Sequence, residues 1–189
     1  DRLPVRMLAV GSGDLLFTID EVGGIFVWNI GDVPGTAPLS RRLGITVDPE
    51  SVSVASNGST VAFEAFQGHV VVRDVAGEDE PVTLRVHRSG RTGIRTRLAL
   101  DGSLLVTSGG SLLQLWSLDD LSPGVGADLD VSALALDSGG RIAALGFRDG
   151  HIQVLTVSQL QTGSHRAEGS NYIGHQGGIS SIAVNAAQG

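Results

Sequence analysis

Short apolar runs separated by turn residues recur along this chain. One kind of run places Ala after a hydrophobic residue, and it occurs at Leu8-Ala9-Val10, Val54-Ala55-Ser56, Leu98-Ala99-Leu100, Leu134-Ala135-Leu136 and Ile182-Ala183-Val184. Most of these runs are followed within a few positions by residues that favour tight turns: Gly13-Asp14, Asn57-Gly58, Asp101-Gly102 and Ser138-Gly139-Gly140. Because such residues tolerate the positive φ angles of short hairpins, the pattern predicts a succession of β-hairpins.

Further runs complete a repeating unit. A second apolar run follows each turn, at residues 15–18, 61–63, 104–107 and 142–145, and a third lies at 25–28, 70–73, 112–116 and 152–155. A fourth strand is weaker, with residues 82–86 as its clearest case. The third runs end in register at Trp28, Arg73, Trp116 and Leu155, which are 45, 43 and 39 residues apart. Four strands in about 40–45 residues are typical of a β-propeller blade, whereas the alternative, a β-sandwich, would not repeat one residue order in this way.

The residues in this register resemble the WD-repeat family. Gly174-His175 and the segment 179–185 are similar to the opening of a WD repeat. Trp28-Asn29, Arg73-Asp74 and Trp116-Ser117 stand where the family has its Trp-Asp pair, and Asp149-Gly150 matches the family's Asp-Gly turn. The resemblance implies an all-β chain, a β-propeller of four-stranded antiparallel blades with about four complete blades plus the first strand of a fifth. We expect one partial propeller over residues 1–189, with blades at 4–47, 48–90, 91–129 and 130–174 and the start of a fifth at 175–189.

The chain departs from the family in its hydrogen-bonded tetrad of His, Ser or Thr, Asp and Trp. His87 lies 29 residues before Trp116, a suitable spacing, but Gly110 takes the place of the Asp in that blade. Asp149 keeps the position, but Leu155 replaces Trp there. We therefore expect Trp28, Trp116, Asp149, His87 and His175 to be structural repeat positions, with His175 bonding its loop to a blade. We also expect apolar packing between neighbouring sheets to hold the blades together.

The number of blades leaves three interpretations open. Propellers of this family commonly close with about seven blades. The chain is then a segment of a longer propeller, or it pairs with a copy of itself to close the ring, or it is the ordered part of a larger protein. The first residue is Asp1 rather than Met, which also favours a processed product or a piece of something longer.

Composition narrows the class of function. The formal net charge is −7, and the 13 basic residues are all Arg. An acidic surface disfavours nucleic-acid binding, and no run of about 18 apolar residues indicates a membrane helix. The absence of Cys excludes disulfides and a Cys nucleophile and leaves the compartment open. We expect a cytoplasmic protein, and the use of Arg in an Ala- and Gly-rich chain favours a bacterial source.

The candidate partner-binding residues are mostly basic. Residues 85–97 hold five Arg and one His, and our candidates there are Arg88, Arg91, Arg95 and Arg97. Guanidinium groups bind carboxylates or phosphates, so the expected partner is another protein or peptide with acidic groups. The alternative is that these arginines pair with the acids at residues 78–80 or are simply solvated. In the family the residue before the Asp-Gly turn faces the same surface, which adds Glu21, Phe66 and Arg148, although Phe66 has the alternative of packing inside its blade.

These observations favour a non-catalytic interaction scaffold or sensor module of a larger protein. The rival is a propeller enzyme or ligand-binding propeller with its site at the central channel. That rival requires acids or histidines on the inner strands, but the equivalent positions hold Met7, Val54, Thr96, Ala133 and Ser181. No two of the five histidines have the spacing of a zinc pair. We therefore expect no catalytic residue, cofactor or metal site, while a purely structural set of blades stays a third interpretation.

Overall fold

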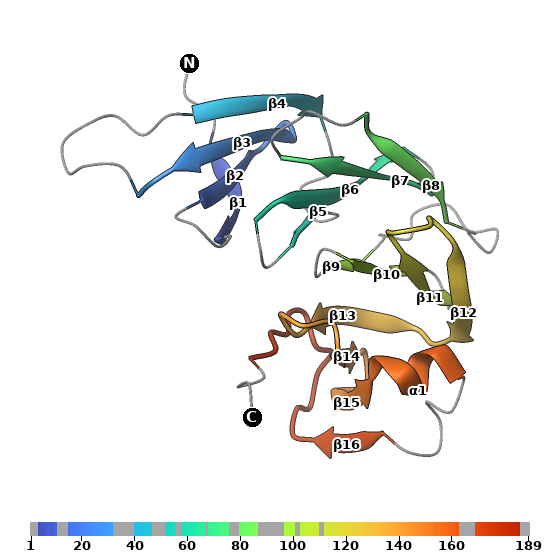
Figure 1. The fold of residues 1–189 in the computed structure, drawn as a ribbon. Coiled ribbons are helices and arrows are strands. Elements are labelled where there is room, and N and C mark those ends of the chain that lie inside the picture. The colour runs from blue at the N-terminus through green and yellow to red at the C-terminus, as the bar shows by residue number, and fades with distance from the viewer. Residues whose placement is uncertain are drawn as a thin grey trace. The chain divides into compact units, whose positions relative to one another are not determined.

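The computed structural model describes residues 4–10, 15–31, 40–46, 52–55, 58–66, 68–75, 80–86, 97–100, 103–109, 112–162 and 169–185. The chain divides into two compact units, Asp1–Arg85 and Val86–Gly189. Each unit contains two four-stranded antiparallel sheets, which we number 1 to 4 in chain order (Figure 1). In every sheet the strands pair in the order of the sequence.

The first unit holds sheets 1 and 2. Sheet 1 consists of β1 (Val5–Val10), β2 (Leu15–Asp20), β3 (Gly24–Asn29) and β4 (Ser40–Thr46). Sheet 2 consists of β5 (Val52–Val54), β6 (Thr60–Phe66), β7 (His69–Asp74) and β8 (Val82–Arg85).

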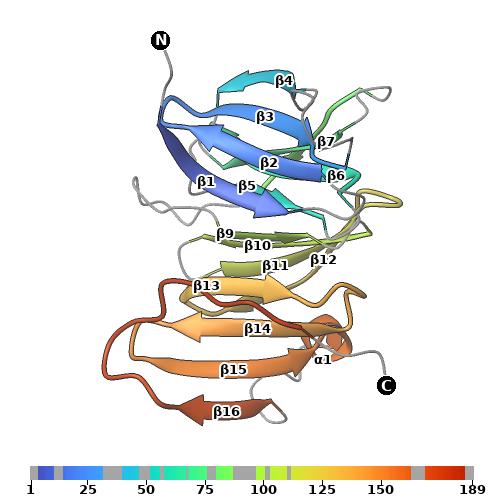
Figure 2. The same cartoon turned by 90° about the vertical axis from the view of Figure 1, so that its left-hand side faces the viewer.

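The second unit holds sheets 3 and 4 and one short helix (Figure 2). Sheet 3 consists of β9 (Arg97–Leu100), β10 (Leu104–Gly109), β11 (Leu112–Ser117) and β12 (Pro123–Asp128). Sheet 4 consists of β13 (Val131–Leu136), β14 (Ile142–Phe147), β15 (His151–Thr156) and β16 (Ser170–Ile173), with α1 (Val157–Thr162) between the last two strands. The prediction of an all-β chain made of four-stranded antiparallel sheets is confirmed, while the total number of blades stays a prediction.

The strand register confirms the alignment of the repeats. The four aligned residues each pair with the same position of the preceding strand: Trp28 with Leu16, Arg73 with Val61, Trp116 with Leu105 and Leu155 with Ala143. Five residues before three of these aligned positions stands a glycine with positive φ, at Gly23 (81°), Gly68 (81°) and Gly150 (90°). Because side chains rarely adopt that conformation, these glycines fix the hairpin between the second and third strands.

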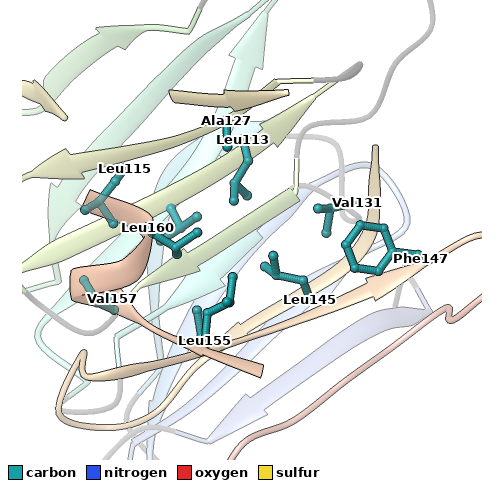
Figure 3. Close-up of a cluster of buried hydrophobic side chains, with 11 residues drawn as sticks. Leu113, Leu115, Ala127, Val131, Leu145, Phe147, Leu155, Val157 and Leu160 are labelled. Carbon is teal, nitrogen blue, oxygen red and sulfur yellow. The ribbon is translucent and has the colours of Figure 1, made fainter. Parts of the chain in front are cut away.

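Apolar contacts between the two sheets of each unit form its core. In the first unit Phe17 and Ile25 of sheet 1 cluster with Val61 and Phe63 of sheet 2. In the second unit Val106, Leu113 and Leu115 of sheet 3 cluster with side chains of sheet 4 and α1 (Figure 3), namely Val131, Ala143, Leu145, Phe147, Leu155, Val157 and Leu160. Burying a side chain of this size contributes about 1.5–3 kcal/mol. The expected apolar packing between neighbouring sheets is thus confirmed within each unit.

The helix α1 was not expected from the sequence. The Thr156 hydroxyl accepts a hydrogen bond from the backbone N–H of Gln159 at 3.3 Å, and the Gln159 side chain accepts one from the N–H of Thr156 at 2.7 Å. This reciprocal pair is a capping box, which satisfies two backbone donors at the helix start. Val157 and Leu160, three residues apart, lie on one face of the helix and are buried against the core of the second unit.

We expected the start of a fifth blade at 175–189, and the described residues of that range, 175–185, form no strand. They run instead across sheet 4 (Figure 2). Ile179 is the buried residue of this segment, and its backbone N–H donates to the carbonyl of Phe147 at 3.0 Å.

Candidate functional site

The turn between β14 and β15 carries two exposed charged side chains, Arg148 and Asp149, near the exposed Asp130 that precedes β13 and the half-buried His151. We call these four residues the hairpin surface. Arg148 is 80% exposed, and its Nε lies 3.8 Å from the carboxylate of Asp130, which is 62% exposed. The structure therefore places the predicted candidate Arg148 in solvent, where a partner can reach it.

The aromatic pair beneath this surface holds the histidine ring in place. The rings of His151 and Phe147 stack, with centroids 3.9 Å apart and planes at 9°. The carboxylate of Asp149 accepts a hydrogen bond from the His151 backbone N–H at 3.2 Å and lies 2.5 Å from His151 Nδ1. The hydrogen bond from the His151 ring, followed by that from its backbone, lowers the pKa of Asp149 below its ordinary value. Asp149 is therefore a carboxylate at neutral pH, and it orients the imidazole.

Asp149 occupies the expected turn position, but its bonds lie within the hairpin and its side chain is 70% exposed. The tetrad described above would give an Asp at this position a Trp and a Ser or Thr within its blade. In sheet 4 the apolar side chains of Leu155 and Leu145 occupy those two positions, and both are buried. His175 is exposed. Its backbone carbonyl lies against the hairpin at Gly150.

The segment 174–185 supports the hairpin from one side. The Ser132 hydroxyl lies 2.7 Å from the carbonyl oxygen of Ile179 and 3.1 Å from that of Gly146. A Cβ added at Gly146 would lie 2.6 Å from Ile179 Cγ2, closer than such atoms approach one another. The Ile179 side chain thus packs directly on the backbone of β14, which fixes one side of the hairpin surface.

The β2–β3 turn of sheet 1 is equivalent to the β14–β15 turn of sheet 4, but it carries different side chains. Glu21 and Val22 are exposed there. Asp20 is buried beneath them and accepts hydrogen bonds from the backbone N–H groups of Val22 at 3.0 Å and Gly24 at 2.7 Å. The candidate Glu21 therefore lies in solvent at the position that corresponds to Arg148.

The other candidates are placed only in part. Phe66 pairs with His69 at the end of β6, and Arg97 pairs with Ser108 at the start of β9. The described residues do not include Arg88, Arg91, Arg95 and His87. The predicted arginine cluster therefore stays a prediction.

Sequence reasoning missed a hydrogen-bonded pair inside two of the sheets. Trp28 Nε1 donates to the Thr18 hydroxyl at 2.8 Å, and Trp116 Nε1 donates to Thr107 at 3.1 Å. In sheets 2 and 4, where the Trp position holds Arg73 and Leu155, the Thr position holds Phe63 and Leu145. The strand alignment alone could have revealed that these two positions change together.

Two further observations concern metal binding and membrane-spanning helices. Within the described ranges, no group of three or more His, Cys, Asp or Glu side chains is arranged to hold a metal ion. Among these same residues, no helix has the length and apolar character needed to cross a bilayer.

Comparison with known proteins gives similarity in structure but not in sequence. No family model and no curated protein matches the chain. The structure of U3-55K is similar, with a TM-score of 0.69 and 15% identity over 95% of this chain and 54% of that one. A chain in the crystal structure of a mitotic checkpoint complex is also similar, with a TM-score of 0.63 and 16% identity over 93% of this chain and 51% of that one.

Both of these proteins are WD-repeat β-propellers, and this chain spans about half the length of each. At such low identity the similarity shows the fold alone. The fold is WD-repeat-like, as the register of the repeats indicated.

Proposed function

We propose that this chain is a non-catalytic protein-interaction module that displays variable side chains on a repeated sheet frame. The observation that carries the proposal is the contrast between the equivalent turns of sheets 1 and 4. Both turns are fixed by a positive-φ glycine, yet one exposes Glu21 and Val22 and the other exposes Arg148. A constant frame with different exposed residues suits recognition, because affinity arises from a few well-placed side chains.

The proposed partner is a protein or peptide with acidic groups. Arg148 is held by one exposed carboxylate at 3.8 Å, a distance that leaves most of its guanidinium donors available to a partner. Four more arginines lie at positions 88, 91, 95 and 97 of the sequence. In a chain of net charge −7, such local positive groups would steer an acidic partner to one place.

We further propose that the module works within a larger protein. Its span of about half the length of the similar structures supports this interpretation.

The proposal is tested with fluorescein-labelled peptides rich in Asp and Glu, compared with matched peptides in which Asn and Gln replace the acids. Fluorescence anisotropy should show binding of the acidic peptides alone, weakening as salt rises because exposed charges are screened. Arg148→Ala should reduce affinity several-fold, and the combined Ala substitution of Arg88, Arg91 and Arg95 should reduce it further. Arg42→Ala, which removes an exposed arginine of sheet 1, is the matched control.

Equal binding of both peptide sets, or equal losses in Arg42→Ala and Arg148→Ala, would refute the acidic partner. The broader proposal has its own test, a photo-crosslinking amino acid at position 148 in cells that make the protein. Failure of that residue to form any protein adduct, together with failure at position 21, would refute an interaction role for these turns.

A further inference from the structure

Segment 174–185, which crosses sheet 4 (Figure 2), contacts the backbone of the β14–β15 turn directly beside Arg148. The carbonyl oxygen of Phe147 accepts two hydrogen bonds. One comes from the backbone N–H of Gly150 at 3.2 Å and closes the turn, and the other comes from the backbone N–H of Ile179 at 3.0 Å. The turn and the segment are therefore joined at a single carbonyl, that of the residue before Arg148.

Two further glycines, besides Gly146, allow the segment to approach the turn so closely. A Cβ added at Gly150 would meet the backbone carbonyls of His175 and Gly177, the second at 2.9 Å. A Cβ added at Gly178 would lie 3.1 Å from the carbonyl oxygen of Arg148. Backbone atoms cannot turn aside as a flexible side chain can, so the segment fixes the backbone on both sides of Arg148.

The segment is held to sheet 4 mainly at one residue. Among its described residues only Ile179 is buried, and the others are exposed or half-buried. The hydroxyl of Ser132, which lies between the carbonyl oxygens of Ile179 and Gly146, ties this residue to the sheet. A segment with so few buried contacts opens at a small cost in free energy, and its docking depends on Ile179.

The equivalent turn of sheet 1 is supported differently. The backbone N–H of Glu21 donates a 3.1 Å hydrogen bond to the carbonyl of Pro4, which directly precedes β1. In sheet 4 the contacts beside Arg148 come from a segment that follows the last strand, β16. This support of the sheet 4 turn can therefore be lost while all four strands stay paired.

We propose that docking of segment 174–185 regulates recognition at Arg148, with Ile179 as the positioning residue. This inference rests on the acidic-partner function proposed above. While Ile179 is seated, the turn backbone is fixed and a partner meets the exposed Arg148 in one place. Once Ile179 is released, binding must also order the turn, which costs affinity. Because such coupling is reciprocal, an acidic partner at Arg148 stabilises the docked segment in turn.

Fluorescence anisotropy with the peptides rich in Asp and Glu tests the first half of the proposal. Ile179→Ala should weaken binding about three- to tenfold, the range of a typical coupling between sites. Ser132→Ala should act in the same direction, whereas Ile179→Val keeps the branched side chain and should bind nearly as tightly as the unsubstituted chain. Ile30→Ala, at an exposed isoleucine of the first unit, is the matched control and should leave the affinity unchanged.

Two further readouts separate positioning from a general loss of structure. In the Arg148→Ala background, Ile179→Ala should cause no further loss of affinity, because its effect passes through Arg148. Saturating acidic peptide should slow hydrogen exchange at the Ile179 amide of the unsubstituted chain, but not in Arg148→Ala. The exchange measurement on the unsubstituted chain needs no substitution, and circular dichroism confirms that each variant is folded.

The outcomes distinguish this inference from the proposed function. If the unsubstituted chain binds the peptides and both Ile179→Ala and Ser132→Ala bind equally well, the inference is overturned and the proposed function stands. Losses that add in full when Ile179→Ala is combined with Arg148→Ala overturn it as well, as does exchange at Ile179 that the peptide leaves unaltered. If the unsubstituted chain binds no acidic peptide, the proposed acidic partner and this inference fail together.

Discussion

The indole Nε1 of Trp116 donates a 3.1 Å hydrogen bond to the hydroxyl of Thr107 on the neighbouring strand of sheet 3. Both side chains are buried, Thr107 completely. The corresponding bond from Trp28 to Thr18 in sheet 1 is 2.8 Å long, but Trp28 is only partly buried. The same Trp–Thr pair is therefore buried in sheet 3 and partly exposed in sheet 1. If the Thr hydroxyl is removed, water can reach the indole N–H in sheet 1 but not in sheet 3.

Thr107→Val should lower the free energy of unfolding of the second unit by about 1–3 kcal/mol, because it leaves a buried indole N–H without an acceptor. Thr18→Val should cost the first unit less than about 1 kcal/mol, since water reaches Trp28. The chain has two Trp, one in each unit. Urea unfolding followed by fluorescence therefore reports on one unit when the other Trp is replaced by Phe. Equal losses in the two variants would contradict the role given to burial.

A second prediction concerns the buried carboxylate of Asp137, which is 1% exposed and caps the β13–β14 turn. Burial alone would raise the pKa of Asp137. The backbone N–H groups of Ile142 at 2.7 Å and Arg141 at 2.6 Å, together with the Arg141 charge, outweigh burial and hold that pKa below its ordinary value. A folded-state pKa below the unfolded-state value stabilises the fold above about pH 4, and the stabilisation is lost as pH falls through the folded-state pKa.

Asp137→Asn should therefore destabilise the second unit at pH 7 by about 1.5–3 kcal/mol, the range for hydrogen bonds to a charged group. The difference from the unsubstituted chain should shrink as pH falls below about 4, because the unfolded chain binds the proton first, and it should vanish once pH has passed the lower pKa of the folded state. Urea unfolding at a series of pH values measures this, with Asp128→Asn, at an exposed carboxylate, as the control. A difference that is constant with pH would show that charge is not what stabilises the turn.

The sequence predicted the sheets because strands and hairpins are encoded locally. Alternating apolar residues and turn glycines lie within a few positions of one another, so the four aligned third strands and their turns could be placed. The helix α1 was missed because its six residues are too few to show a helical period, although its capping residues Thr156 and Gln159 were visible signals.

The candidate site was harder to predict than the sheets, because the exposure of a side chain also depends on contacts with residues far away in the sequence. Asp20 and Asp137 stand beside turns, where a carboxylate is usually solvated, yet both are buried and cap backbone N–H groups. Segment 179–185 has the apolar pattern of a strand. Its place against Gly146 depends on a contact between residues 33 positions apart, which no local pattern records.

That contact leads to a third prediction. Gly146→Ala places a methyl group where Ile179 now lies, so it should displace residues 174–185 from sheet 4. Hydrogen exchange should then be faster at the Ile179 amide, whose bond to Phe147 holds the segment in place.

Gly174→Ala is the matched control for that experiment, because an added Cβ there meets no atom within 4 Å. It should leave the exchange rates of the segment unchanged. Unchanged exchange in Gly146→Ala would mean that sheet 4 can adjust around the methyl group and that Ile179 does not depend on the glycine.

The last prediction separates stability from recognition at Arg148. The pair formed with Asp130 is exposed on both sides, and exposed ion pairs contribute about 0–1 kcal/mol because water and salt screen them. Arg148→Ala should therefore change the free energy of unfolding by less than about 0.5 kcal/mol while weakening binding of the acidic peptides several-fold. Arg148→Lys keeps the charge but loses the planar donor pair, so it should recover only part of the affinity. Urea unfolding and peptide anisotropy on the same three proteins measure both quantities. A large loss of stability with unchanged peptide affinity would make Arg148 a structural residue of sheet 4 rather than a contact for a partner.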